Sequence, residues 1–132
     1  MNKHDGKIIS CVEREYLARS ILLLVRYNNS NGKVMTIKFL KKWSARFSRS
    51  HIEMRVFDMY VALNPEYTYQ KYDEDLCTRL ATSIYIMANY DNGLETYSRE
   101  KSYYEGIIVN LMHKFFYRKT FYQIQDVLSE IY

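Results

Sequence analysis

The most constraining feature of this sequence is a run of apolar residues between Tyr104 and Phe116 that recurs at helical spacing. The apolar positions follow one another at intervals of three, one and four, which places them on one face of an α-helix. Such a face has to be buried, because apolar surface is unfavourable in water. The sequence therefore predicts a core-facing helix, and its stripe consists of Tyr104, Ile107, Ile108, Leu111, Met112, Phe115 and Phe116.

Residues that favour tight turns are scarce, since the 132 residues include four glycines and one proline. β-Sandwiches and barrels need many turns built from such residues, so we expect an all-α fold. A chain of 16.0 kDa buries about two-thirds of its extended surface on folding, enough for one core. We expect a single domain over residues 1–132, with a flexible N-terminus at residues 1–9.

Capping boxes predict where three helices begin, because a Ser or Thr and a Glu or Gln three residues later satisfy each other's free amides. These boxes start at Ser10, at Ser102, which lies at or near the start of its helix, and at Thr120. Asn31–Gly32 is a stop signal for the first helix. The apolar side of that helix consists of Leu17, Ile21, Leu24 and Val25.

The middle of the chain predicts two further helices. The first is basic, continues to Leu63 and stops at Asn64–Pro65, because a residue before proline avoids the α region. The second begins with the acids at 73–75, which favour a helix N-terminus, and ends before Asp91. Its small and apolar residues predict the central hydrophobic helix of a bundle of about seven. The basic helix carries Lys38, Lys41, Lys42, Arg46 and Arg49 beside Leu40, Trp43, Phe47 and Met54.

Sequence motifs for catalysis and metal binding are missing. His4, His51 and His113 do not have the spacing of zinc or di-iron ligands. Four scattered glycines cannot build a phosphate-binding loop. We therefore expect that the protein is not an enzyme and holds no metal or cofactor.

Charge and targeting signals narrow the choice of partners. A net charge of +4 permits contact with nucleic acid, but the aromatic residues of the core stripe do not form an exposed stacking face. We expect no nucleic-acid partner. The polar start and the absence of about 18 consecutive apolar residues predict neither a secretory signal nor a transmembrane anchor. Cys11 and Cys77 are expected to be buried thiols, with a disulfide as the alternative.

The order of the predicted helices resembles that of the Bcl-2 family of apoptosis regulators. The stretch 40–49 is similar to the second helix of that family, because it keeps Leu40, a small residue at Ser44, and Phe47. Ala45 stands where relatives carry an acid. This departure implies that the segment no longer serves as a death ligand itself.

The head of the predicted central helix adds to the resemblance. Arg79 matches the arginine of the family's Asn-Trp-Gly-Arg motif, and Thr78 replaces the glycine. Residues 13–21 and 124–126 are similar to the first and last homology regions, although the usual Gly-Gly-Trp is missing. The chain also has no long loop after the first helix and no membrane tail, so it is similar to viral homologues from large DNA viruses such as iridoviruses and poxviruses.

The resemblance implies a Bcl-2-like bundle and an anti-apoptotic function. In this family a surface groove accepts an amphipathic Bcl-2 homology-3 helix from pro-apoptotic proteins such as Bim, Bak or Bax. Arg79 would pair with an aspartate of that ligand. The implied location is the host cell cytoplasm or, peripherally, mitochondria. The residues expected to line the groove are Phe47, His51, Met54, Thr78, Arg79, Thr82 and Ile86.

Three alternatives stay open at this stage. The first is a Bcl-2 fold with a closed groove that inhibits host innate immune signalling. The second is a basic helical protein that binds nucleic acid. The third concerns assembly: a homodimer through surplus aromatic residues, for which Tyr67, Tyr69, Tyr72, Tyr97 and Tyr103 are the candidates.

Overall fold

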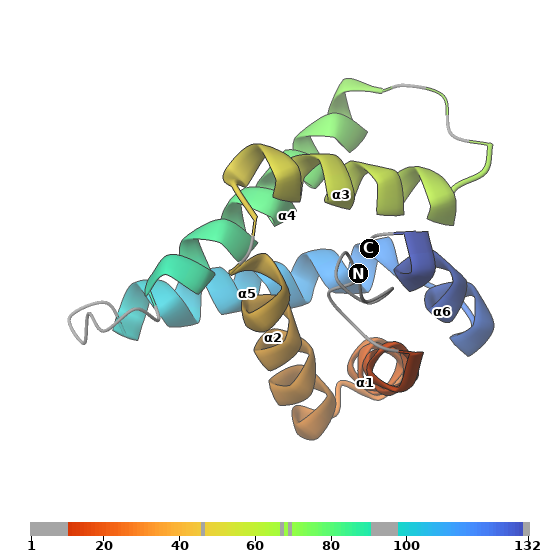
Figure 1. The fold of residues 1–132 in the computed structure, drawn as a ribbon, viewed down its shortest axis with the longest axis horizontal. Coiled ribbons are helices and arrows are strands. Elements are labelled where there is room, and N and C mark those ends of the chain that lie inside the picture. Colours follow the sequence, from red (N-terminus) through yellow and green to blue (C-terminus); the bar gives the residue numbers. More distant parts are fainter. Residues whose placement is uncertain (1–10, 46, 67, 69, 91–97, 131–132) are drawn as a thin grey trace, which may run out of the picture.

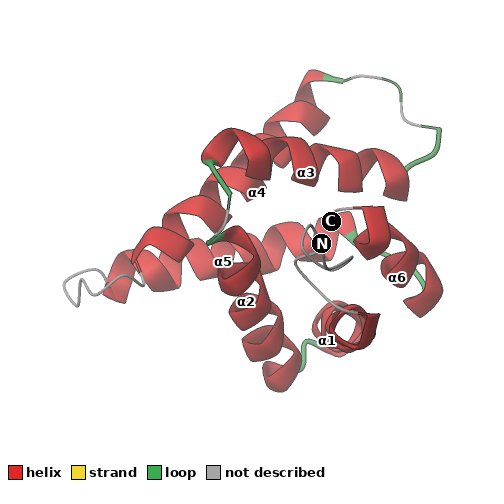
Figure 2. Ribbon diagram, in the orientation of Figure 1, coloured by secondary structure: helices red, strands yellow, loops and turns green. Residues whose placement is uncertain are grey.

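The protein is all-helical in the computed structural model, which describes residues 11–45, 47–66, 68, 70–90 and 98–130. Within these residues there are six helices and no strand (Figure 2), so the predicted all-α class is confirmed. The predicted flexible segment 1–9 lies outside the described residues. The helices are α1 (Cys11–Tyr27), α2 (Ser30–Ser44), α3 (Arg49–Leu63), α4 (Lys71–Tyr90), α5 (Ser98–Phe115) and α6 (Phe121–Glu130).

Helices α1 and α2 form a tight hairpin, and the predicted stop at Asn31–Gly32 is wrong. The chain turns at Asn28, whose φ of 48° lies in the left-handed region that asparagine tolerates. The side chain of Asn29 then caps α2 by accepting a hydrogen bond of 3.0 Å from the Gly32 amide. Gly32 therefore lies inside α2, where it lets the two helices approach closely.

The prediction of a single basic helix that runs through Arg49 is also wrong, because α2 ends at Ser44 and a new helix, α3, begins at Arg49. Ser48 has an extended backbone and caps α3, accepting a hydrogen bond of 3.3 Å from the His51 amide. Arg49 therefore belongs to α3. The predicted end at Asn64–Pro65 is confirmed, and the ammonium group of Lys119 donates to the last carbonyl of α3, at Leu63.

Helices α4, α5 and α6 follow the predicted pattern. Acids lie in the first turn of α4, and the helix ends at Tyr90 as expected. Helix α5 begins at Ser98, so Ser102, which was predicted at or near the start of this helix, lies four residues after its first residue. The capping box at Thr120 is confirmed, since Thr120 and Gln123 bond each other's amides at 2.9 and 3.2 Å.

Two helical hairpins lie on either side of α5, and α6 packs against α1 and α3 (Figure 1). Helices α3 and α4 lie together on one side, and α1 and α2 lie on the other, while α5 contacts both α4 and α1. Helix α4 packs against α2, α3 and α5. The predicted stripe on α5 faces this core: Ile108, Leu111, Met112, Phe115 and Phe116 are buried, and Tyr104 and Ile107 are half-buried against it.

Candidate functional site

The first wall of the predicted groove begins at the connection between α2 and α3. The ring of Phe47 lies edge-to-face against Trp43, with centroids 5.4 Å apart, and against His51 at 6.0 Å. Phe47 is half-buried against the core, whereas His51 is exposed. These three rings therefore join the end of α2 to the first turn of α3.

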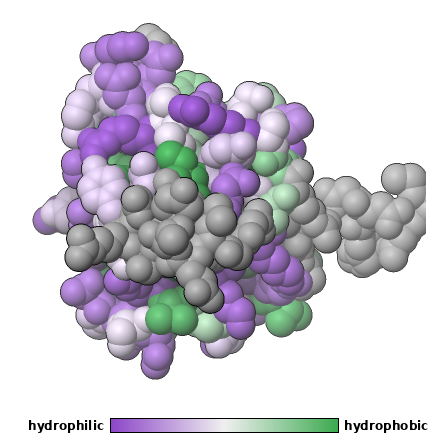
Figure 3. Space-filling model, turned by 90° about the vertical axis from the view of Figure 1, so that its left-hand side faces the viewer, coloured by the Kyte–Doolittle hydropathy of each residue, from purple (hydrophilic) through white to green (hydrophobic). Residues whose placement is uncertain are grey.

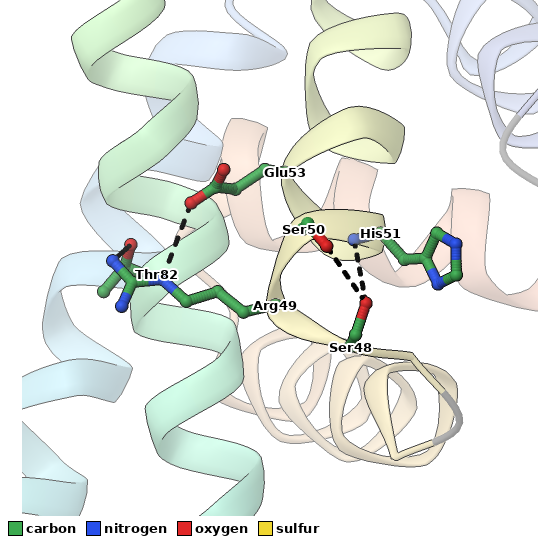
Figure 4. A network of polar contacts seen from close by, with 6 residues as sticks. All are labelled: Ser48, Arg49, Ser50, His51, Glu53 and Thr82. Atoms are coloured by element: carbon green, nitrogen blue, oxygen red, sulfur yellow. Dashed lines mark hydrogen bonds and ion pairs between the residues drawn. The ribbon is translucent and has the colours of Figure 1, made fainter.

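Helices α3 and α4 lie side by side and antiparallel, joined by polar contacts near both ends. Near one end the guanidinium of Arg49 pairs with Glu53 at 3.5 Å and donates a hydrogen bond of 3.2 Å to the Thr82 hydroxyl (Figure 4). Near the other end the hydroxyl of Tyr60 donates to Asp73 at 2.5 Å. The helices that carry the two predicted walls of the groove are therefore packed directly against each other.

Two of the predicted groove residues share a hollow on this surface. Met54 of α3 and Thr78 of α4 both line an open hollow of about 360 Å³. Met54 is 53% exposed, so its thioether is available to a partner. The rest of the lining consists of Ser50, Glu53, Phe57, Glu74 and Cys77.

Cys77 lies at this hollow but is not a reactive nucleophile. Its side chain is buried, and the burial, assisted by the charges of Asp73 and Glu74, raises the pKa of the thiol from 9.0 to about 12. The thiol is therefore protonated at neutral pH, and only the thiolate attacks electrophiles or binds metals. Its predicted burial is confirmed. Cys11, by contrast, is exposed, so its predicted burial is wrong, and both cysteines are free thiols.

Arg79 is exposed on α4 and makes no ion pair with any described residue. Two of the acids that precede it on α4 have other partners: Asp73 accepts from Tyr60, and Asp75 pairs with Lys71 at 3.7 Å. Thr82 and Ile86 follow Arg79 by one and two turns on the same face of α4 and are half-buried. This face therefore presents a free guanidinium beside partly apolar surface.

A second hollow, which was not predicted from the sequence, lies between α1 and α2 and has a volume of about 280 Å³. We call it the α1–α2 groove. The sequence did carry a signal for it: Val12, Tyr16, Leu23 and Tyr27 recur at helical spacing on a face of α1 that adjoins its core side, and all four are exposed. Its lining is Val12, Glu13, Tyr16, Leu17, Ser20, Met35, Lys38, Phe39 and Lys42.

Other parts of the surface give weaker indications of a binding site. On the face shown in Figure 3, hydrophobic residues form separate patches among hydrophilic ones. Among the described residues, no group of three or more His, Cys, Asp or Glu could hold a metal ion. A search of the same residues for membrane spans finds no helix of sufficient length and apolar character.

Of the predicted interface tyrosines, Tyr72 and Tyr103 are exposed, whereas Tyr67, Tyr69 and Tyr97 lie outside the described residues.

No protein-family model matches the chain, and neither the curated proteins nor the solved structures contain a match.

Proposed function

We propose that this chain is a viral anti-apoptotic protein of the Bcl-2 type, a binding protein that sequesters the amphipathic helix of pro-apoptotic proteins. The order of its helices and the similarity of residues 40–49 and 73–79 to family motifs support this proposal, and the all-α class is compatible with it. The ligands are helices of the Bim, Bak or Bax kind. The protein acts in the host cell cytoplasm, or peripherally at mitochondria.

The availability of Arg79 is the observation that carries the proposal. A guanidinium that is exposed and not paired with Asp73 or Asp75 can bind a ligand carboxylate through two parallel hydrogen bonds. An arginine already held by acids of its own helix would have to break those contacts first. Arg79 has no such contact to lose.

The surroundings of Arg79 offer apolar contacts for the rest of such a ligand. Ile86 lies two turns beyond Arg79 on the same face of α4, and Thr78, the residue before Arg79, lines the open hollow together with Met54. A helical ligand presents apolar residues one turn apart, so it can contact both regions while its aspartate reaches Arg79. On this proposal the ligand lies on the outer side of the α3–α4 pair.

The direct test is a calorimetric titration of the purified protein with a peptide of the Bim helix. The proposal expects a dissociation constant below about 100 μM, which corresponds to about −5.5 kcal/mol. Substitution of Arg79 by alanine should weaken binding by about 1.5 to 4 kcal/mol, the range of a desolvated hot spot. Arg26→Ala is the matched control, because Arg26 is also exposed but lies in the last turn of α1. Equal affinities of the two variants would contradict the role of Arg79.

A closed-groove protein that inhibits innate immune signalling is the second candidate. The hydrogen bond from Arg49 to Thr82 favours it, because this contact joins α3 to α4 where an open groove was expected. This candidate predicts no binding of the Bim, Bak or Bax peptides below about 100 μM. The same titration therefore separates the two functions.

A further inference from the structure

The α1–α2 groove is a hollow that the proposed function does not use. Figure 1 shows α1 end-on and α2 lengthwise, so the two helices cross. They are closest at Gly32, where a Cβ atom would stand 2.8 Å from backbone atoms of α1. The hollow lies beside this close approach and is lined by residues 12–20 of α1 and 35–42 of α2. It is therefore a space that two crossing helices leave open between them.

The walls of the hollow are apolar. Val12 and Tyr16 form its α1 edge and are 75% and 58% exposed, and the buried Leu17 lies next to them in the lining. Met35 and Phe39 are half-buried along α2. The volume of about 280 Å³ is close to the lower end of the range for small-molecule sites, which are lined mainly by apolar side chains. Size and lining together indicate a small ligand with an apolar tail.

The charges at the hollow indicate the head group of such a ligand. Glu13 and Lys42 both line the hollow and pair with each other at 3.3 Å. Lys38 lies one turn before Lys42, is exposed, and makes no ion pair in the described part of the chain. Two lysines one turn apart on a helix also repel each other, and an anion beside them relieves this repulsion. The charge at the hollow therefore favours an anionic head group over a neutral or cationic one.

We propose that the α1–α2 groove binds a medium-chain fatty acid. The tail lies along the apolar walls between the two helices, and the carboxylate lies at Lys38, whose ammonium group binds an anion as a point charge. The flexible thioether side chain of Met35 can adjust to the tail. Each methylene group that the hollow buries should strengthen binding about fourfold, until the tail is longer than the hollow.

Titration of the isotope-labelled protein with sodium decanoate, followed through the backbone amide shifts, tests the proposal. Decanoate stays below the concentration at which it forms micelles. We expect saturable shifts at Tyr16, Met35 and Phe39, with a dissociation constant below about 1 mM. Octanoate and hexanoate should bind more weakly, by about fourfold for each methylene group removed.

Two variants separate the roles of the head group and the tail. Lys38→Glu replaces an attraction with a repulsion, so it should weaken decanoate at least about fivefold and leave the neutral analogue decanol unchanged. Lys33→Glu is the matched control, since Lys33 is also exposed and unpaired on α2 but does not line the hollow. Val12→Asp places a charge on the apolar edge and should weaken both decanoate and decanol.

Three outcomes would overturn the fatty-acid site. The first is the absence of saturable shifts in the groove up to about 5 mM decanoate. The second is an equal effect of the Lys38 and Lys33 substitutions on decanoate binding. The third is a groove that binds anionic phospholipid vesicles or a synthetic peptide of leucine and glutamate but not decanoate, which would assign it to a membrane or a protein partner. Shifts caused by the Bim peptide are expected on α3 and α4, so a failure of the fatty-acid site leaves the proposed function testable.

Discussion

Gly32 in the first turn of α2 lies directly against Leu24 of α1. A Cβ atom at residue 32 would stand 2.8 Å from the Leu24 backbone nitrogen and 2.8 Å from the Ser20 carbonyl oxygen. Backbone atoms cannot move aside as the end of a flexible side chain can. We therefore expect Gly32→Ala to push the two helices apart and to lower the free energy of unfolding by about 1 to 3 kcal/mol, measured by urea denaturation.

Gly106→Ala is the matched control for this prediction. Gly106 lies in the middle of α5, and a Cβ atom there would meet nothing within 4 Å. Alanine should then raise the free energy of unfolding by about 0.5 to 1 kcal/mol, because it has the higher helix propensity. Equal effects of the two substitutions would show that propensity, and not close packing, governs position 32.

The hydroxyl of Thr36 on α2 is buried and has no hydrogen-bond partner among the described residues. A buried unpaired hydroxyl costs about 1 to 3 kcal/mol, and valine has nearly the same shape without it. Thr36→Val should therefore stabilise the protein by roughly 1 kcal/mol in thermal or urea unfolding. Thr36→Ser keeps the hydroxyl, loses a methyl group and should destabilise the protein. A valine variant no more stable than wild type would indicate that the hydroxyl is satisfied.

The capping box at the start of α6 offers a local test of helix stability. The Thr120 hydroxyl accepts a hydrogen bond of 3.2 Å from the Gln123 amide. Thr120→Ala leaves that amide without its partner and should cost about 1 kcal/mol of stability. Thr120→Ser retains the oxygen and should restore most of the loss. If serine and alanine are equally destabilising, the hydroxyl does not act as a cap.

The buried thiol of Cys77 makes stability depend on pH in the alkaline range. Its pKa is about 12 in the folded protein and 9.0 as an ordinary thiol, so between these values the unfolded chain releases the proton and the folded chain keeps it. Deprotonation then favours the unfolded state, and the free energy of unfolding falls as the pH rises above 9. Below pH 9 this thiol has no such effect.

Comparison with Cys77→Ala isolates this effect from the other groups that titrate at high pH. The difference in the free energy of unfolding between wild type and variant should be constant from pH 7 to 8 and should shrink by about 1 kcal/mol at pH 10. Urea denaturation at these three pH values provides the measurement. A difference that does not change with pH would mean that the thiol ionises equally in both states.

Local signals in the sequence predicted those helix ends that depend on neighbouring residues alone. Asn64–Pro65 ended α3 because proline restricts the residue before it, and Thr120 started α6 through a contact with a residue three positions later. The prediction that Gly32 follows the end of a helix was wrong, because a glycine occurs in two kinds of position. A glycine can end a helix or let a second helix approach, and only the position of α1 decides between them.

The candidate site could be predicted only in part, because it also depends on contacts that the sequence alone does not show. The sequence indicates that Arg79 is near a helix start, but its freedom depends on Tyr60 and Lys71 having engaged the neighbouring acids. The α1–α2 groove was missed because its two edges come from different helices, and the exposed face of α1 is apolar as well as its buried one. Sequence periodicity identifies an apolar face but does not say which of two faces is covered.

Mapping the ligand on the protein by NMR tests the central claim most directly. Isotope-labelled protein is titrated with unlabelled peptide of the Bim helix, and the backbone amide shifts are followed. We predict shifts at Met54, Thr78, Thr82 and Ile86, on the outer side of α3 and α4, with residues of the α1–α2 groove unchanged. The absence of shifts at saturating peptide, or shifts confined to the α1–α2 groove, would contradict the proposed function.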